Sequence, residues 1–414
     1  MTADKAAELA KASSPDVASR QAALAASAAK VDQAIVSWLP RLSAFGRATR
    51  LSPITPPTFA GGIRFPVVLN NYTIQGTLSV PLSDYLFRLS KAYSAATLNE
   101  EASKLDSVAG ETKAASDARI AFYGWVKALG QREVLVQALD TSKEHLVDAQ
   151  NLLKAGLASK GDLLGVEAQV AGAQASVEQA NGYVAVAEEQ LRMAMHIEPT
   201  AKIALGEDVL GDLPKVGVDV NALRQEAIAQ RPEVKSIQLS EEALLKSASA
   251  LRAGQWPRLD GTGNVYYSNP NQRIFPTTAE FRTTWDVSLQ LSWSPNDALA
   301  SRAQAAELEA NASRVRAQRT QIRDGLGLEV VAAASELRTA EANVDTVKSQ
   351  LVASEEAYRV RRETYRAGKA TSVELADAEV NLFRAQLAAV TANVDLRIAR
   401  VKLDHATGRD VRRR

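Results

Sequence analysis

The chain has 414 residues, enough for two or three ordinary domains or for one elongated assembly. Its formal net charge is +1, so bulk attraction to nucleic acid is not expected. Cysteine is absent, which excludes disulfides and thiolate metal ligands. The three histidines are far apart in sequence and form no helical pair, so we expect neither a metal site nor a cofactor: His145, His196 and His405.

Membrane and export signals are weak in this sequence. No apolar run approaches the ~18 residues that a membrane-spanning helix needs. The first residues lead directly into a helical pattern and show no signal peptide, so an exported protein would here be in a mature or trimmed form. Neither observation excludes a membrane protein built from β-strands, because such strands give a much weaker signal per segment.

The first half of the chain begins with helices and then changes to strands. A short helix is predicted over residues 3–13, and a longer one begins at Pro15 and stops before Pro40. After this second proline the apolar period changes from helical to two, which predicts strands over about residues 41–51 and 72–81. A long exposed loop is predicted between them.

A helical hairpin follows, with its tip near Gly156. About 70 residues, from Asp84 to Ala155, precede the tip, and as continuous helix they would extend on the order of 100 Å. After the tip, apolar residues recur in heptads with alanines between them: Leu163, Val170, Val177, Val184 and Leu191. Such a seam predicts closely packed helices with a left-handed supercoil.

The second half repeats this order. Both pairs of prolines that bound the longer helix, Pro15 to Pro40 and Pro232 to Pro257, are 25 residues apart, which indicates an internal duplication. The second half is predicted to contain strands over about 258–267 and 284–293 and a hairpin with its tip near residue 368. We therefore divide the chain into a first repeat, a linker without clear periodicity and a second repeat: residues 1–196, 197–222 and 223–414. The last residues, 408–414, are expected to be frayed.

The predicted strands are apolar on one face and polar on the other, which allows two interpretations. One is a soluble β-sandwich in which the apolar face is the core. In the other the apolar face meets lipid, and then the open sheet edges must be closed, because unpaired backbone groups are costly in hydrocarbon. Three copies would supply twelve strands and a polar lumen. The second interpretation is favoured, because the long hairpins leave no helix layer to cover a sheet.

The chain resembles the TolC-like outer-membrane efflux proteins over nearly its whole length. The duplication supports this resemblance, as do the residues at the helix starts, at the helix-to-strand joints and at the two tips: Ser14-Pro15-Asp16-Val17, Arg231-Pro232-Glu233-Val234, Leu39-Pro40-Arg41-Leu42, Trp256-Pro257-Arg258-Leu259, Gly156…Asp162-Leu163 and Tyr365…Gly368…Glu374. It implies a mainly α-helical protein with a β-barrel part. In a homotrimer, four strands per chain would form a twelve-stranded outer-membrane barrel, continued by a long α-helical coiled-coil barrel.

The resemblance also implies a function and partners. The protein would be a passive exit duct for small molecules or polypeptides in tripartite efflux or type I secretion. It would lie in the outer membrane of a Gram-negative bacterium, in contact with its lipid, and extend into the periplasm. Its partners would be a periplasmic adaptor, that is, a membrane fusion protein, and an inner-membrane pump.

The resemblance further implies a periplasmic gate at the tips, formed by Glu374, Asp377, Asp162 and Tyr365. The first two are three residues apart and share a helix face, so three copies would form two acidic rings. The alternative is that these are solvated helix carboxylates. For Tyr365, which also occupies a heptad core position, the alternative is simple packing.

Part of the family's closing network is absent from this sequence. The gate arginine of some members corresponds to Ala370, and a polar partner corresponds to Gly161. Lys160, Arg366 and Lys369 are the candidates to substitute for them.

The two tips themselves match the positions where family members meet the adaptor: Ala155, Gly156, Leu157, Ala367, Gly368 and Lys369. Both glycines also have a conformational reason, because a tight turn between helices needs a left-handed residue. The adaptor contact and the turn are compatible explanations.

No catalytic constellation is recognisable, so the protein is not expected to be an enzyme. The alternative function is a soluble periplasmic coiled-coil adaptor or scaffold. An adaptor would have one hairpin flanked by compact β domains, in contrast to two hairpins and four amphipathic strands. A scaffold would be extracted without detergent.

Overall fold

The computed structural model describes residues 1–55, 61–62, 67–209, 211 and 213–413. The chain forms two compact units. The first unit comprises residues 1–22, 104–235 and 320–414, and the second comprises residues 23–103 and 236–319. These units cut across the two predicted repeats, because each unit takes segments from both halves of the sequence.

The element order is that of two successive runs of helix, paired strands and helical hairpin. The helices are α1 (Ala3–Ser13), α2 (Pro15–Val36), α3 (Leu82–Phe87), α4 (Leu89–Lys154), α5 (Lys160–Met195), α6 (Val220–Gln230), α7 (Pro232–Arg252), α8 (Pro295–Arg366) and α9 (Ser372–Thr407). Short 3-10 helices are η1 (Ala253–Gln255) and η2 (Arg409–Arg413), and the strands are β1 (Arg41–Arg50), β2 (Asn70–Val80), β3 (Arg258–Asn269) and β4 (Arg282–Ser292).

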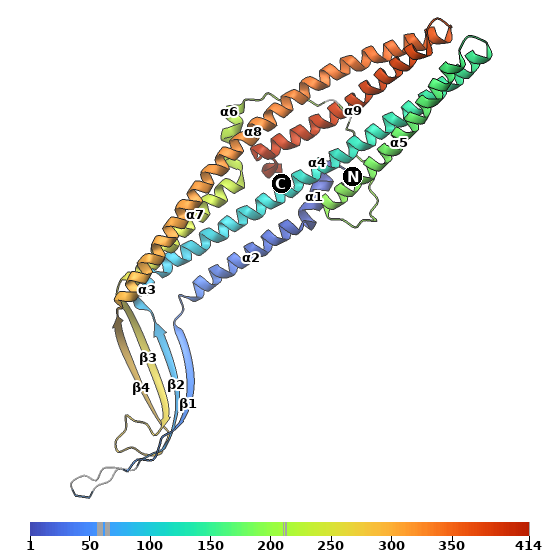
Figure 1. Cartoon of the computed structure of the whole chain (residues 1–414). Coiled ribbons are helices and arrows are strands. Elements are labelled where there is room, and N and C mark those ends of the chain that lie inside the picture. Colours follow the sequence, from blue (N-terminus) through green and yellow to red (C-terminus); the bar gives the residue numbers. More distant parts are fainter. Residues whose placement is uncertain (56–60, 63–66, 210, 212, 414) are drawn as a thin grey trace. The chain divides into compact units, whose positions relative to one another are not determined.

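In the second unit, the four strands form one antiparallel sheet in the order β1-β2-β3-β4, as Figure 1 shows. The prediction of four strands per chain is therefore confirmed for the described residues. The apolar face of this sheet is open: Leu42 is 81% exposed, Trp285 70% and Leu289 71%. A β-sandwich would bury these side chains, so the sandwich interpretation is wrong.

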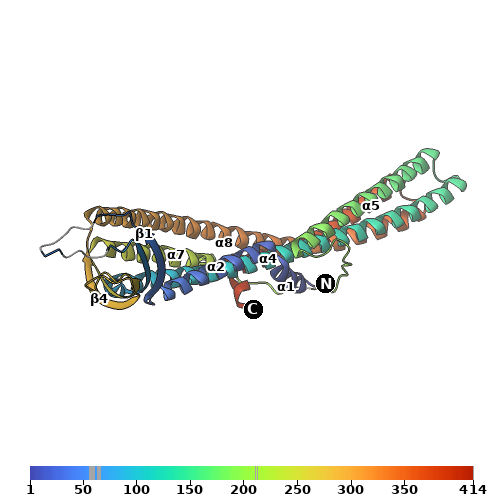
Figure 2. The same ribbon diagram turned by 90° about the horizontal axis from the view of Figure 1, so that it is seen from below.

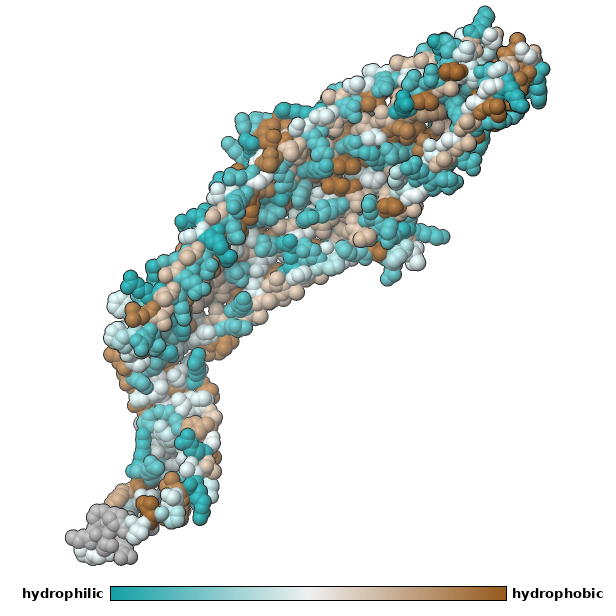
Figure 3. All heavy atoms as spheres, in the orientation of Figure 1, coloured by the Kyte–Doolittle hydropathy of each residue, from teal (hydrophilic) through white to brown (hydrophobic). Residues whose placement is uncertain are grey.

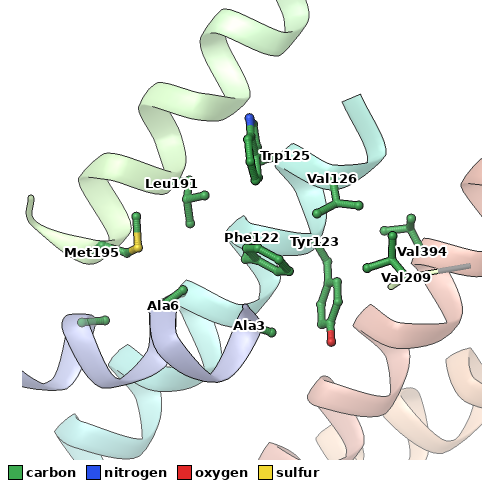
Figure 4. Close-up of a cluster of buried hydrophobic side chains, with 12 residues drawn as sticks. Ala3, Ala6, Phe122, Tyr123, Trp125, Val126, Leu191, Met195, Val209 and Val394 are labelled. Carbon is green, nitrogen blue, oxygen red and sulfur yellow. The ribbon is translucent and has the colours of Figure 1, made fainter. Parts of the chain in front are cut away.

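In the first unit, one hydrophobic core joins α1, α4, α5 and α9 (Figure 4). Phe122 and Trp125 of α4 pack here with Leu191 of α5, because three aromatic residues close together in the sequence give an otherwise alanine-rich helix a bulky apolar face. Arg397 of α9 lies beside this core and donates from Nε to the carbonyl oxygen of Val209 at 2.8 Å. This bond fixes the connection between the halves to the helices.

A second core in the same unit packs α6 against α8 and α9, with Leu223, Val330 and Leu403 buried. We did not predict α6, whose residues begin inside the segment interpreted as linker. Its role parallels that of α1, since α1 contacts α5 and α6 contacts α9. Each short helix thus packs against the returning helix of a hairpin.

Two other expectations about helices need correction. The helix expected from Asp84 is interrupted at Arg88, which separates α3 from α4. The C-terminal tail was expected to be frayed, which is wrong for its first residues. Arg409 forms an ion pair with Glu226 at 2.8 Å, and Asp410 Oδ2 lies 2.8 Å from His405 Nδ1.

The helical surfaces mix hydrophilic and hydrophobic residues (Figure 3). On the face of the hairpins seen in Figure 3, hydrophobic residues form separate patches among hydrophilic ones. In Figure 2, α5 runs back beside the last part of α4. Among the described residues, no helix is both long enough and apolar enough to cross a membrane.

Candidate functional site

The tips of both hairpins have the same turn. Gly156 has φ +72° and Gly368 has φ +67°, the left-handed conformation that lets a helix end in a tight turn. At the first tip, the backbone N–H of Leu157 donates to the carbonyl of Leu152 at 2.9 Å, and at the second tip Lys369 donates to Thr364 at 2.9 Å. The conformational reason for both glycines is confirmed. The tip side chains of Ala155, Leu157, Ala367 and Lys369 are exposed.

Each turn leads into a helix that begins with a capping box. In α5 the Asp162 carboxylate accepts from the backbone N–H of Ser159 at 2.9 Å and from its hydroxyl at 2.7 Å. In α9 the Glu374 carboxylate accepts from the N–H and hydroxyl of Thr371 at 2.9 and 3.2 Å. Each serine or threonine hydroxyl in turn accepts from the backbone N–H three residues later. Asp162 and Glu374 therefore complete the first turns of their helices.

These hydrogen bonds stabilise the ionised carboxylates. The hydrogen bond from the Ser159 hydroxyl is the larger of two contributions that lower the pKa of Asp162 below its ordinary value, and the bond from the Ser159 backbone N–H is the smaller. The hydrogen bond from the Thr371 backbone N–H contributes most to lowering the pKa of Glu374. The Thr371 hydroxyl contributes less, and the charge of Arg361 contributes least. Arg361 Nη1 lies 3.5 Å from Glu374 Oε1. Two of the four predicted gate residues are thus negatively charged but already bound locally.

Asp377 differs from Glu374. It is exposed on α9 three residues further along, and among the described residues it makes no hydrogen bond or ion pair. Of the two carboxylates predicted to form rings, Asp377 is therefore the one without a side-chain partner in the part of the chain that the structure describes.

Tyr365 is buried, as its heptad position predicts, and its ring meets the His145 ring edge-on at 5.1 Å. Its hydroxyl lies near Ser372 but makes no hydrogen bond of regular geometry. Burial raises the pKa of the Tyr365 phenol, and the Ser372 hydroxyl partly opposes this shift. The structure does not join the hydroxyl to Asp162 by a hydrogen bond.

Beneath Tyr365 lies a polar cluster that the sequence did not indicate. His145 Nδ1 is 3.4 Å from Glu379 Oε2, and both side chains are 1% exposed. Gln169 Nε2 donates to the same carboxylate oxygen at 2.8 Å, and Ser372 Oγ lies 3.5 Å from His145 Nε2. These residues come from α4, α5 and α9, so the cluster connects the two hairpins of one chain.

Two ion pairs also connect the hairpins, between α4 and α8. Arg362 Nη2 lies 2.5 Å from Glu144 Oε2, and Arg366 Nε lies 2.9 Å from Asp148 Oδ2. Both pairs involve residues four apart on each helix, so they form two successive rungs. Of the three candidate substitutes for the missing gate arginine, only Arg366 makes an ion pair in the described part of the chain, and its partner is not Asp162.

The rest of the structure identifies the type of protein. Two long helical hairpins are joined to a sheet with an exposed apolar face, which fits a protein of the outer membrane and not an adaptor with a single hairpin. Residues 6–195 and 223–409 match the family described as outer membrane efflux protein. The chain belongs to the outer membrane efflux protein family. It lies in the outer membrane of a Gram-negative bacterium and is an exit duct of tripartite efflux.

Solved structures share the fold at low sequence identity. The outer-membrane channel OprN is 20% identical with a TM-score of 0.81, covering 98% of this chain and 89% of that chain. The CmeC channel of Campylobacter jejuni is 15% identical with a TM-score of 0.80, covering 98% and 85%. The open-state MtrE channel of Neisseria gonorrhoeae is 18% identical with a TM-score of 0.78, covering 98% and 88%. No curated protein sequence matches the chain significantly.

Proposed function

We propose that three copies of this chain form the duct and that each chain contributes four strands of a twelve-stranded barrel. The observation that carries this proposal is the exposed apolar face of a sheet whose outer strands, β1 and β4, each pair with one strand among the described residues. Such edges are unfavourable in hydrocarbon unless they pair, and pairing β4 of one copy with β1 of the next would close the sheet.

We further propose that the duct is passive and has no catalytic activity. The energy for transport would come from an inner-membrane pump, which is coupled to the duct through a periplasmic adaptor that docks on the two tips. Leu157 and Val373 are exposed there beside the glycine turns, which supports a contact with apolar residues of a partner. Small molecules would be the cargo of efflux, and polypeptides that of a type I secretion system.

In the proposed gate, the four predicted residues have different roles. Asp162 and Glu374 hold the helix starts, Tyr365 packs over the buried cluster, and Asp377 supplies a charge that is not bound locally. The two ion pairs from α8 to α4 would hold the hairpins of one chain together in the closed state. Opening would then separate these pairs.

Single-channel recording in planar bilayers tests the proposal. The purified protein should form channels that prefer potassium over chloride, and Asp377→Asn should reduce this preference more than Glu374→Gln. The matched control is Glu178→Gln, which removes an exposed carboxylate about five turns from the start of α5. Absence of channels would contradict the duct. Channels whose selectivity responds equally to Glu178→Gln and Asp377→Asn would contradict the gate assignment.

A further inference from the structure

The polar face of the sheet carries more basic than acidic side chains. Cross-strand partners point to the same face, and the registers place Arg41 opposite Ser79 and Arg47 opposite Thr73. By the same alternation, this face also carries the following charged residues of β3 and β4: Arg258, Asp260, Asp286 and Arg282. The strands therefore contribute four arginines and two aspartates to one face.

Each acidic group on or beside this face is matched by an arginine. Arg258 Nε lies 2.9 Å from Asp260 Oδ1, and Arg282 pairs with the loop residue Glu280 at 2.8 Å. The third pair is formed by Arg273, which lies in the loop between β3 and β4. Its Nη2 lies 2.8 Å from Asp286 Oδ1, and its guanidinium lies 5.3 Å from the centre of the Tyr266 ring. These three pairs are electrically neutral.

Arg41 and Arg47 of β1 remain without an acidic partner among the described residues, and both are exposed. A difference between the two repeats explains why Arg41 has no acidic partner. Arg41 and Arg258 both follow the proline at a helix-to-strand joint, but the position of Asp260 is taken by Ser43 in the first repeat. The first repeat thus keeps the arginine and lacks its carboxylate.

Arg47 faces a hollow on the polar side of the sheet, with a volume of about 460 Å³. The other lining groups include Thr49, Asn71, Thr73 and the Arg273 guanidinium, whose charge Asp286 already neutralises, and none of the residues that line the hollow is acidic. Hydroxyl, amide and guanidinium groups are the donors that hold carboxylates and phosphates. The hollow is therefore suited to anions.

We propose that Arg41 and Arg47 make the sheet part of the duct attract anions. The inference rests on the proposed trimer, in which each position would form a ring of three arginines. The two rings would lie about 15 Å apart along the pore, because six residues span about 20 Å of a strand that is tilted from the barrel axis. A neighbouring β4 beside β1 would bring no new free carboxylate on this face, because its Asp286 is already held by Arg273. Basic walls around a pore raise the local concentration of anionic solutes.

Reversal potentials in a potassium chloride gradient test this assignment. The measurements use the Asp377→Asn and Glu374→Gln background, so that the tip carboxylates do not mask the sheet. In this background the ratio of chloride to potassium permeability should exceed one. Arg41→Gln with Arg47→Gln should lower the ratio roughly threefold at low salt, with a smaller change when salt screens the charges.

Controls separate charge from folding. Arg258→Gln with Asp260→Asn removes a neutral pair and should leave the ratio unchanged, and Arg41→Lys with Arg47→Lys should retain it. If Arg41→Gln prevents assembly, Arg47→Gln alone should still lower the ratio. Channels of normal conductance whose ratio does not respond to Arg47→Gln would overturn this inference and leave the duct intact. Failure of the unsubstituted protein to form channels would instead contradict the proposed function.

Discussion

The buried pair of His145 and Glu379 makes the sharpest prediction about stability near the gate. The Glu379 carboxylate is buried, and it has Gln169 as a hydrogen-bond donor and His145 within 3.4 Å. Its second oxygen, Oε1, has no hydrogen-bond partner among the described residues. Gln169 is the carboxylate's one hydrogen-bond donor among the described residues, and His145→Leu would remove the imidazole, its other polar neighbour, from a closely packed helical interface.

The expected cost follows from this geometry. Removing one partner of a buried pair costs about 3–5 kcal/mol. The 3.4 Å separation is long for a strong pair, so we expect about 3 kcal/mol, at the lower end of that range. This corresponds to roughly a hundredfold increase in local opening. Glu379→Met added to His145→Leu removes the buried carboxylate and should restore most of the lost stability, because well-packed apolar side chains of similar volume can replace a buried polar pair.

Hydrogen exchange of the detergent-solubilised protein measures this effect. Amides of residues 141–150 in α4 and 375–385 in α9 should exchange much faster in His145→Leu and return towards the original rate in the double variant. Amides around Phe122, in the separate core of α1, α4, α5 and α9, serve as the internal reference. Equal exchange rates in the single and double variants would refute the reasoning, because they would mean that the buried Glu379 carboxylate does not destabilise the protein when His145 is replaced.

Three further predictions concern the tips. Thr371→Ala removes the α9 cap and should cost about 1 kcal/mol, seen as about fivefold faster exchange in the first turn of that helix, whereas Thr371→Ser should not change the rate. Arg362→Gln with Arg366→Gln removes both ion pairs between α4 and α8 and should raise the open probability in bilayers about twofold to fivefold; an unchanged probability would exclude these pairs from closure. The pKa of Glu374 is lowered in the folded protein, so the stability that its ionised carboxylate gives to α9 is fully present above pH 4.5 and is lost as the pH falls through the lowered pKa. The start of α9 should therefore fray on acidification below this lowered pKa, and Glu374→Gln should remove the pH dependence.

Regular periodicity explains why most of the fold could be predicted. Proline pairs at the same spacing set the helix ends, and alternation along β2 to β4 identified the strands. The helix α6 was missed because it has only 11 residues and its buried side chains, Leu223 and Ala227, form too short a pattern. The order of the tail was missed for a different reason, since the pairing of Arg409 with Glu226 joins positions far apart in the sequence.

The candidate site was predictable only where its interactions are local. The capping boxes follow from Ser159 and Asp162, and from Thr371 and Glu374, three residues apart, so the sequence contained this signal. The His145 cluster depends on three helices. Its one local sign is that His145 lies at heptad-like spacing among other buried residues of α4: Ala138, Ser142 and Ala149. Which residue faces a buried polar group across a hairpin cannot be obtained from spacing within one helix.

The central claim is that the pore exists only where three chains meet, and the mass of the detergent-solubilised protein tests it most directly. Native mass spectrometry should give a single species of three times 44.4 kDa, about 133 kDa. It should dissociate to the monomer only under denaturing conditions, because open sheet edges favour pairing between copies. A stable monomer of 44.4 kDa that stays dispersed without detergent would contradict the account.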